Sequence, residues 1–85
     1  MAVKAYVLIV TDPVRTKEVM RLIREIPEVE ESHEVMGPYD IVVEIVAKDL
    51  AEIPPILGER IRRIEGIEST TSLVTFPERA VGGSG

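Results

Sequence analysis

The residues best suited to chemistry lie together at one turn, formed by Gly37, Pro38, Tyr39 and Asp40. Gly-Pro is a strong turn signal, because glycine reaches backbone angles closed to other residues and proline fixes its own angle and has no N–H. The apolar run at 41–46 predicts a strand, so a ring, a carboxylate and backbone amides should meet at the rim of a rigid sheet. The structural alternative is that Asp40 only caps its own hairpin.

Outside this turn, side chains that could do chemistry are scarce. The 85 residues contain no cysteine and a single histidine, His33, which leaves no disulfide, no thiol nucleophile and no His/Cys metal site. Glu30 and Glu31 are neighbours in an expected strand and point to opposite faces, so they form no general acid/base pair. We therefore expect no catalytic residue, no metal and no cofactor.

Size and charge restrict the class of protein. The chain is short enough to be one domain, expected over residues 1–77, with a flexible tail over 78–85 that ends in a Gly-Ser-rich stretch. The formal net charge is −5 and the basic residues are split between two segments, so direct binding to nucleic acid is not expected. The short apolar run before Asp12 is neither a signal peptide nor a membrane span, and a cytoplasmic protein is expected.

The hydrophobic pattern predicts two βαβ units in series, with similar sequences at the two helix-to-strand junctions. Strands are expected at 5–10, 29–36, 41–47 and 70–76. One helix should begin at Asp12-Pro13 and end at Pro27, and another should begin at Asp49 or near Pro54 and end at Gly66. With right-handed crossovers, these elements form an α+β, ferredoxin-like βαββαβ sandwich. Its four-stranded antiparallel sheet has the order 4-1-3-2, with two helices on one face.

The two central strands are apolar on both faces, although helices can cover only one face of the sheet. Left bare, the second face would be a large exposed apolar patch, and such patches mark interfaces. We therefore expect a homo-oligomer based on a dimer packed sheet to sheet, resembling a dimeric α/β barrel. The expected interface residues are Tyr6, Leu8, Val42 and Val74.

Two stretches of the chain resemble a known family. They are Val-x-Gly-Pro-Tyr-Asp-Ile-Val-Val-x-Ile at 35–45 and Arg-x-Ile-x-Gly-Ile-x-x-Thr-x-Ser-x-Val at 62–74. In order and spacing on the βαββαβ frame, residues 3–76 resemble the effector-binding (RAM) domain of the Lrp/AsnC feast/famine regulators. The helix-turn-helix domain that normally precedes this module is missing from the 85 residues. The chain thus resembles the stand-alone members, and direct promoter binding is not expected.

The resemblance implies a ligand, partners and a site. Members of the family bind free amino acids in clefts between subunits and assemble into dimers, octamers or other rings of dimers. A free amino acid, further copies of the chain and a full-length regulator of the same family are therefore the implied partners. The ligand-binding positions of the family fall on Gly37, Pro38, Tyr39, Asp40, Thr70 and Ser72, with serine at the last position in place of the commoner threonine.

These residue types suit an amino acid. Backbone N–H groups of the glycine turn can donate to an α-carboxylate, and Asp40 with the two hydroxyls can accept from an α-ammonium, or the two ends can be held the other way round. Thr70 and Ser72 are two apart on a strand and so share a face. A structural alternative remains here too, because threonine-rich strands are ordinary β-formers.

Three classes of function fit these observations. We expect an amino-acid-binding module that acts in regulation of transcription or of amino-acid metabolism through oligomer assembly. An enzyme is the second class, because fold alone does not exclude one, although the chain has no obvious catalytic set. A purely structural oligomer is the third.

Overall fold

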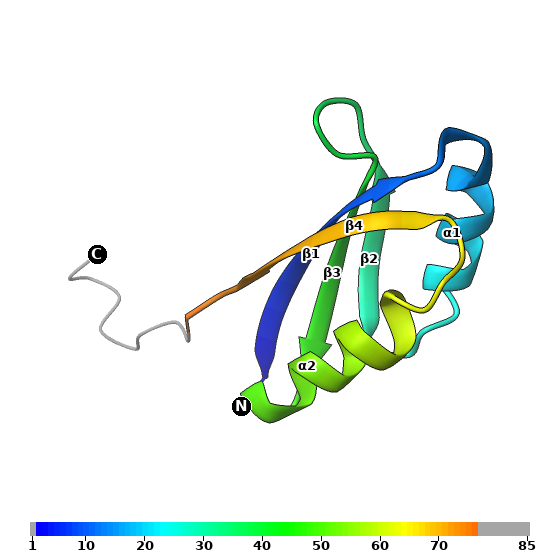
Figure 1. Ribbon diagram of the computed structural model, residues 1–85. Helices are drawn as coiled ribbons and strands as arrows, with labels where there is room; N and C mark the ends of the chain where they lie inside the picture. The colour runs from blue at the N-terminus through cyan, green and yellow to red at the C-terminus, as the bar shows by residue number, and fades with distance from the viewer. Residues whose placement is uncertain (1, 77–85) are drawn as a thin grey trace.

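The computed structural model describes residues 2–76, and it confirms the predicted four-stranded sheet. The strands are β1 (Val3–Thr11), β2 (Val29–Glu34), β3 (Ile41–Ala47) and β4 (Ile67–Val74). All neighbouring pairs are antiparallel, and the order β2-β3-β1-β4 is the predicted order 4-1-3-2 counted from the other edge (Figure 1). Helix α1 (Thr16–Ile23) and a second helical segment containing α2 (Ile53–Pro55) pack on one face of this sheet.

The core is built from one side of the two central strands. Ala5, Val7 and Ile9 of β1 pair with Ile45, Val43 and Ile41 of β3, and all six side chains are buried. Branched side chains of this kind pack well on a pleated surface. The helices close this layer with Val19, Met20, Ile23, Ile53, Ile56 and Ile61. The alternate side chains of β1 and β3 face away from the helices, because successive strand residues point to opposite faces.

The first helix is shorter than predicted. Asp12 begins it as expected, since its carboxylate accepts a hydrogen bond of 3.2 Å from the backbone nitrogen of Val14 and leads into a 3₁₀ turn, Pro13–Arg15. Helix α1 then ends at Ile23 and not at Pro27. The residue before a proline is disfavoured in the helical region, and the chain tightens, with Ile26 N donating to Ile23 O at 3.0 Å.

The second helical segment begins at Asp49, one of the two predicted positions. The Asp49 carboxylate accepts from Ala51 N at 3.0 Å, and Glu52 accepts from Lys48 N at 3.1 Å. These two bonds satisfy one backbone N–H group before the start of the segment and one after it. The arrangement resembles a capping box, except that Glu52 accepts from Lys48, the residue before the cap, and not from the cap residue Asp49.

The path of this segment follows from its two prolines. A 3₁₀ turn, Leu50–Glu52, precedes α2, and a π-helix, Ile56–Ile61, follows it. Pro54 and Pro55 supply no N–H groups, so regular α-helical bonding cannot run through them. The segment ends at Ile61, earlier than the predicted Gly66, and the wider π turn is closed by Arg62 N donating to Leu57 O at 2.9 Å.

The two edge strands differ from the prediction in their bounds and from each other in chemistry. Strand β2 ends two residues earlier than predicted, and β4 begins three earlier and ends two earlier. Strand β2 carries Glu30, Glu31, His33 and Glu34, which discourage pairing with stray strands, whereas residues 69–74 of β4 carry no charge. The predicted flexible tail, 78–85, lies outside the described residues.

Candidate functional site

The hairpin at residues 35–40 joins β2 to β3 and is closed at its base. Val35 N donates to Asp40 O at 2.9 Å, and Asp40 N donates to Ile9 O of β1 at 2.8 Å. The tip is exposed to solvent, since Met36 is 99% exposed. Gly37 at the tip has a φ of +145°, a conformation that favours glycine. A rigid base therefore presents an exposed loop, as the Gly-Pro turn predicts (Figure 1).

The Asp40 carboxylate ties this hairpin to β1. Its Oδ2 atom accepts a hydrogen bond of 2.8 Å from Thr11 N and lies 3.5 Å from the Thr11 hydroxyl. Pairing between β1 and β3 stops at Ile9 and Ile41, so the Thr11 amide extends beyond its neighbouring strand. The Asp40 side chain supplies an acceptor there in place of a further strand residue, and this is a structural role for the residue.

Thr11 also contacts the first turn of the helical layer. Its hydroxyl lies 2.7 Å from that of Thr16, and both residues are buried, at 2% and 8% exposure. The Thr16 hydroxyl is also 3.4 Å from the carbonyl oxygens of Asp12 and Pro13, so the pair has further acceptors. We call residues 11–16 the junction turn, because they join β1 to α1 and contact the hairpin.

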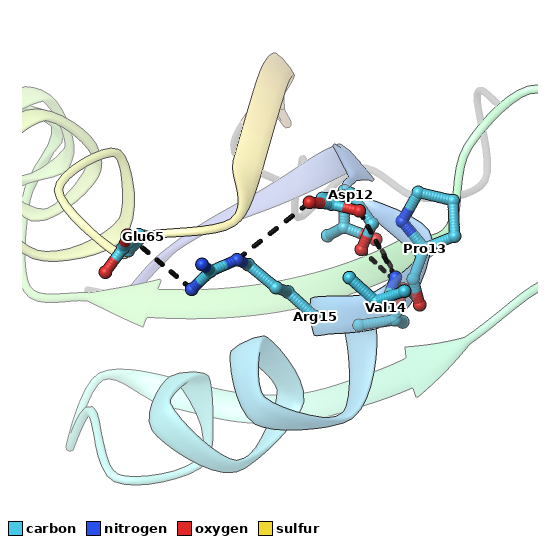
Figure 2. Close-up of polar contacts among 7 residues, drawn as sticks. Asp12, Pro13, Val14, Arg15 and Glu65 are labelled. Atoms are coloured by element: carbon cyan, nitrogen blue, oxygen red, sulfur yellow. Dashed lines mark hydrogen bonds and ion pairs between the residues drawn. The ribbon is translucent and has the colours of Figure 1, made fainter.

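The junction turn is held on its other side by the loop before β4. Asp12 N donates to Gly66 O at 2.8 Å. Arg15 bridges two carboxylates, with its Nε 3.9 Å from Asp12 Oδ2 and its Nη1 3.6 Å from Glu65 Oε2 (Figure 2). Gly66 has a φ of +107°, and a Cβ atom there would lie 2.9 Å from Arg15 Cβ and 3.0 Å from Val19 Cγ2.

Sequence reasoning did not single out these contacts. It predicted Gly66 only as the end of a helix. A local signal existed for Gly66, because a glycine between a helix and a strand often marks a positive φ. No local signal exists for the link between Thr11 and Asp40, which are 29 positions apart.

Thr70 and Ser72 are on the helix-covered face of the sheet, at its β4 edge. They pair with Ile9 and Val7, whose side chains lie in the core, so the expectation of a shared face is confirmed. Thr70 Oγ1 accepts a hydrogen bond of 3.2 Å from Arg62 Nε. Asp40 and Thr70 flank β1 from opposite sides, and two strand spacings separate the outer backbones by about 10 Å. No hydrogen bond joins the hairpin to these hydroxyls among residues 2–76.

The face of the sheet without helices gathers Tyr6, Leu8 and Val42, three of the four expected interface residues. Leu8 pairs directly with Val42, Tyr6 pairs with Leu73 of β4, and these three predicted side chains are half-buried. Val74 differs from the expectation, because it pairs with buried Ala5 and so lies on the opposite, helix-covered face. We call the side without helices the open face.

The ion pair between Lys4 and Glu44 lies on the open face beside these apolar side chains. Lys4 Nζ is 2.7 Å from Glu44 Oε2. The hydrogen bond to Glu44 and the charge of that carboxylate raise the pKa of Lys4 above its ordinary value. The lysine is therefore positively charged at neutral pH, and the open face combines an apolar centre with a neutralised charge pair.

Two cavities lie away from the candidate residues of the hairpin. One, of about 490 Å³, is lined by Lys17, Met20, Arg21, Arg24, Glu25 and Glu34. Another, of about 300 Å³, lies between the second helical segment and Val74. Neither contains any of the six candidate ligand-binding residues, so a ligand at the hairpin would not occupy them.

Two further features are absent from residues 2–76. No helix in this part of the chain combines the length and apolar character needed to cross a membrane. Across the same residues, no three His, Cys, Asp or Glu side chains are grouped so as to hold a metal ion.

The fold and the exposed hairpin define a small ferredoxin-like domain, and comparison with known proteins places it in a class of ligand-binding domains. Residues 4–80 match the family model described as the Lrp/AsnC ligand binding domain. The chain therefore belongs to the Lrp/AsnC family, as its two sequence patterns predict.

Relatives of the chain include regulators, and the chain is also similar to a segment of an enzyme. An uncharacterized HTH-type transcriptional regulator of Pyrococcus furiosus is 39% identical over 75 residues, which are 85% of this chain and 50% of that protein. The chain thus spans about half the length of the regulators that it matches. A homocitrate synthase of Sulfurisphaera tokodaii is 47% identical over 62 residues, which are 72% of this chain and 13% of the enzyme.

A solved structure of similar size has the same fold. The crystal structure of a protein from Thermus thermophilus superposes with a TM-score of 0.86 at 34% sequence identity. The match covers 91% of this chain and 96% of that one.

Proposed function

We propose that this domain binds a free amino acid at the hairpin and transmits its presence through the assembly of several copies. The observation that carries the proposal is the exposed Gly-Pro hairpin on a fixed base, in a chain whose family is described as ligand-binding. Gly37 and Tyr39 offer backbone N–H groups to a carboxylate, while Pro38 has none and stiffens the loop. Asp40 Oδ2 is engaged by Thr11, and we assign Oδ1 to the ammonium group of the ligand.

The hydroxyls of Thr70 and Ser72 belong to the same proposal but to another subunit. Both charged groups of an α-amino acid are attached to one carbon, whereas strand β1 and about 10 Å separate the hairpin from β4 within one chain. We therefore assign the hairpin of one subunit and the β4 hydroxyls of a neighbouring subunit to each ligand. A site between subunits is also consistent with a hairpin that is open to solvent in a single chain.

Self-association through the open face supports this arrangement. A half-buried apolar centre with a neutralised ion pair is suited to packing against a second copy. Further assembly of such dimers into rings would bring hairpins and β4 edges of different subunits together. We propose these assemblies, and association with a full-length regulator of the same family, as the partners of the domain.

Regulation is the proposed output, and we propose no catalytic activity for this chain. The relatives of which this chain spans about half the length are named as HTH-type transcriptional regulators. A second output is favoured by one observation, because the identity to a segment of homocitrate synthase, 47%, exceeds that to the regulators. Control of an enzyme of amino-acid metabolism by the bound ligand is therefore the second candidate.

A screen of the twenty common amino acids tests the proposal. A ligand that binds only the folded state raises the melting temperature, by an amount that grows with ligand concentration. We expect one or a few L-amino acids to do so and to give saturable heat in calorimetric titration, with their D-enantiomers as matched controls. A purely structural oligomer would show no shift with any amino acid.

A further inference from the structure

The junction turn contacts the hairpin half of the proposed ligand site on one side and the loop that leads into β4, the strand of the other half, on the other side. On one side, Thr11 N is bound by the Asp40 carboxylate at 2.8 Å, which fixes the base of the hairpin. On the other side, Asp12 N is bound by Gly66 O at 2.8 Å, at the start of the strand that carries Thr70. Because these two donors belong to adjacent residues, a displacement of one hydrogen bond also displaces the other.

Packing around the junction turn leaves little freedom for independent movement. Thr11 and Thr16 are buried with their hydroxyls 2.7 Å apart, so β1 and the first turn of α1 are joined as well as continuous. Gly66 approaches Arg15 so closely that no Cβ atom fits between them, and Arg15 spans Asp12 and Glu65 (Figure 2). Close-packed groups of this kind transmit displacements instead of absorbing them.

We propose that the junction turn couples neighbouring ligand sites, so that amino-acid binding is positively cooperative. The inference rests on the proposed function, in which each subunit gives its hairpin to one site and its β4 hydroxyls to another. A ligand that orders the hairpin also orders the start of β4 through the junction turn. The next ligand then binds to a half-site that is already ordered and pays less of the entropic cost. Thr11, Gly66 and Arg15 are positioning residues in this scheme and do not touch the ligand.

The first test needs no ligand and measures amide hydrogen exchange under native conditions. Gly66→Ala should displace Arg15 and speed exchange of the Val35 amide at the hairpin, which Gly66 does not contact, by about tenfold or more. Gly58→Ala is the matched control, because a Cβ atom there meets nothing within 4 Å. The Val46 amide at the opposite end of the sheet is the internal reference for lower global stability, so the change at Val35 must exceed any change at Val46.

A second pair of variants tests the coupling from the hairpin to the junction turn. This test remains informative if Gly66→Ala folds poorly. Asp40→Ala removes the acceptor for Thr11 N and should speed exchange of the Asp12 amide, whose acceptor is Gly66 O, while Asp40→Asn keeps an oxygen acceptor and should not. Asp49→Ala removes a carboxylate that accepts from a backbone amide at the other strand-to-helix junction, and it should leave both the hairpin and the junction turn unchanged. Wild-type exchange at Val35 in Gly66→Ala, or at Asp12 in Asp40→Ala, would overturn the coupling.

The second test titrates the amino acid that raises the melting temperature most. Wild-type protein should give a Hill coefficient above one, and Gly66→Ala should bring it close to one. A wild-type Hill coefficient of one overturns the coupling but not the proposed function. Failure of every amino acid to bind overturns the proposed function, and the exchange measurements then still decide whether the junction turn joins the two elements.

Discussion

The α-carbon of Gly66 packs against the side chain of Arg15 so closely that a Cβ atom at position 66 would lie 2.9 Å from Arg15 Cβ. Real Cβ atoms almost never come this near to another side-chain carbon that cannot swing away. The backbone at Gly66 also has a φ of +107°, a conformation that residues with a Cβ atom rarely adopt. Both the steric and the backbone requirement therefore select glycine at this one position.

Replacing this glycine should destabilise the protein. For Gly66→Ala we expect a loss of about 1–3 kcal/mol in the free energy of unfolding, the range for a residue held in an unfavourable backbone region. Gly58→Ala should be neutral or stabilising by up to about 1 kcal/mol, because Gly58 is helical and has open space around it. Urea unfolding of the two variants beside wild type measures the difference. Equal stability of the two variants would contradict the steric account.

The charge of Asp40 should be needed for ligand binding. Asp40→Asn keeps an oxygen for Thr11 N and so keeps the hairpin, but it removes the negative charge facing the ammonium group. Hydrogen bonds to charged groups are worth roughly 1.5–3 kcal/mol, so affinity should fall by about one to two orders of magnitude. Calorimetric titration measures it. Equal affinity in wild type and Asp40→Asn would remove Oδ1 from the site and leave only the structural role.

The hydroxyl of Thr70 should matter less. Thr70→Val nearly preserves volume and removes a neutral group worth about 0.5–1.5 kcal/mol, so affinity should fall by about tenfold at most. Arg62 loses its partner in this variant, which makes Thr70→Ser the appropriate control, because serine keeps the hydroxyl. A larger loss for Thr70→Val than for Asp40→Asn would reverse the roles assigned to the two residues.

The open face should hold two copies together. Leu8→Asp places a charge in the apolar centre of that face, opposite Val42, and burial of an unpaired carboxylate is costly, so the dimer should dissociate. Val14→Asp is the control, since Val14 is 87% exposed and lies in the junction turn, away from the open face. Light scattering coupled to size-exclusion chromatography reports the mass of each. A monomeric wild type at micromolar concentration would rule out the interface.

Duplex DNA should bind weakly to the 85-residue chain. Affinity for DNA depends on neutralising phosphates, and the chain carries a formal net charge of −5. Fluorescence anisotropy with a labelled duplex, at two salt concentrations, measures this directly. Submicromolar binding that weakens steeply with salt would show a basic surface that the net charge conceals.

The sheet and its order could be predicted from the sequence because local patterns agree with one another. The doubly apolar runs of β1 and β3 can only be central strands, and the charges of β2 suit an edge. Helix starts were predicted well, since Asp12 and Asp49 cap them through contacts two residues away. Helix ends were predicted less well, because they depend on how turns tighten before the next strand.

The face on which Val74 lies could not be predicted from its own strand. Alternation fixes that Thr70, Ser72 and Val74 share a face, but the register of β4 against β1 decides which face it is. A slip of one residue would turn Val74 toward Tyr6 and Leu8, as expected from sequence. The register observed pairs it with Ala5 instead. The link between Asp40 and Thr11 was hidden for the same reason, because it depends on how far β1 extends past β3.

Strand β1 lies between β3 and β4, so the first strand of the chain completes its hydrogen bonding only with the last. During synthesis, residues 3–47 can form a sheet of three strands, but one side of β1 stays unpaired until residue 74 has been made. Pairing over such a sequence separation has a high loop-closure cost and slows folding relative to helical proteins of equal size. Until then the exposed edge of β1, with its apolar side chains, is open to pairing with other nascent chains. The rate of folding should therefore depend on when β4 arrives, and a chain truncated before Ile67 should aggregate instead of folding to a smaller domain.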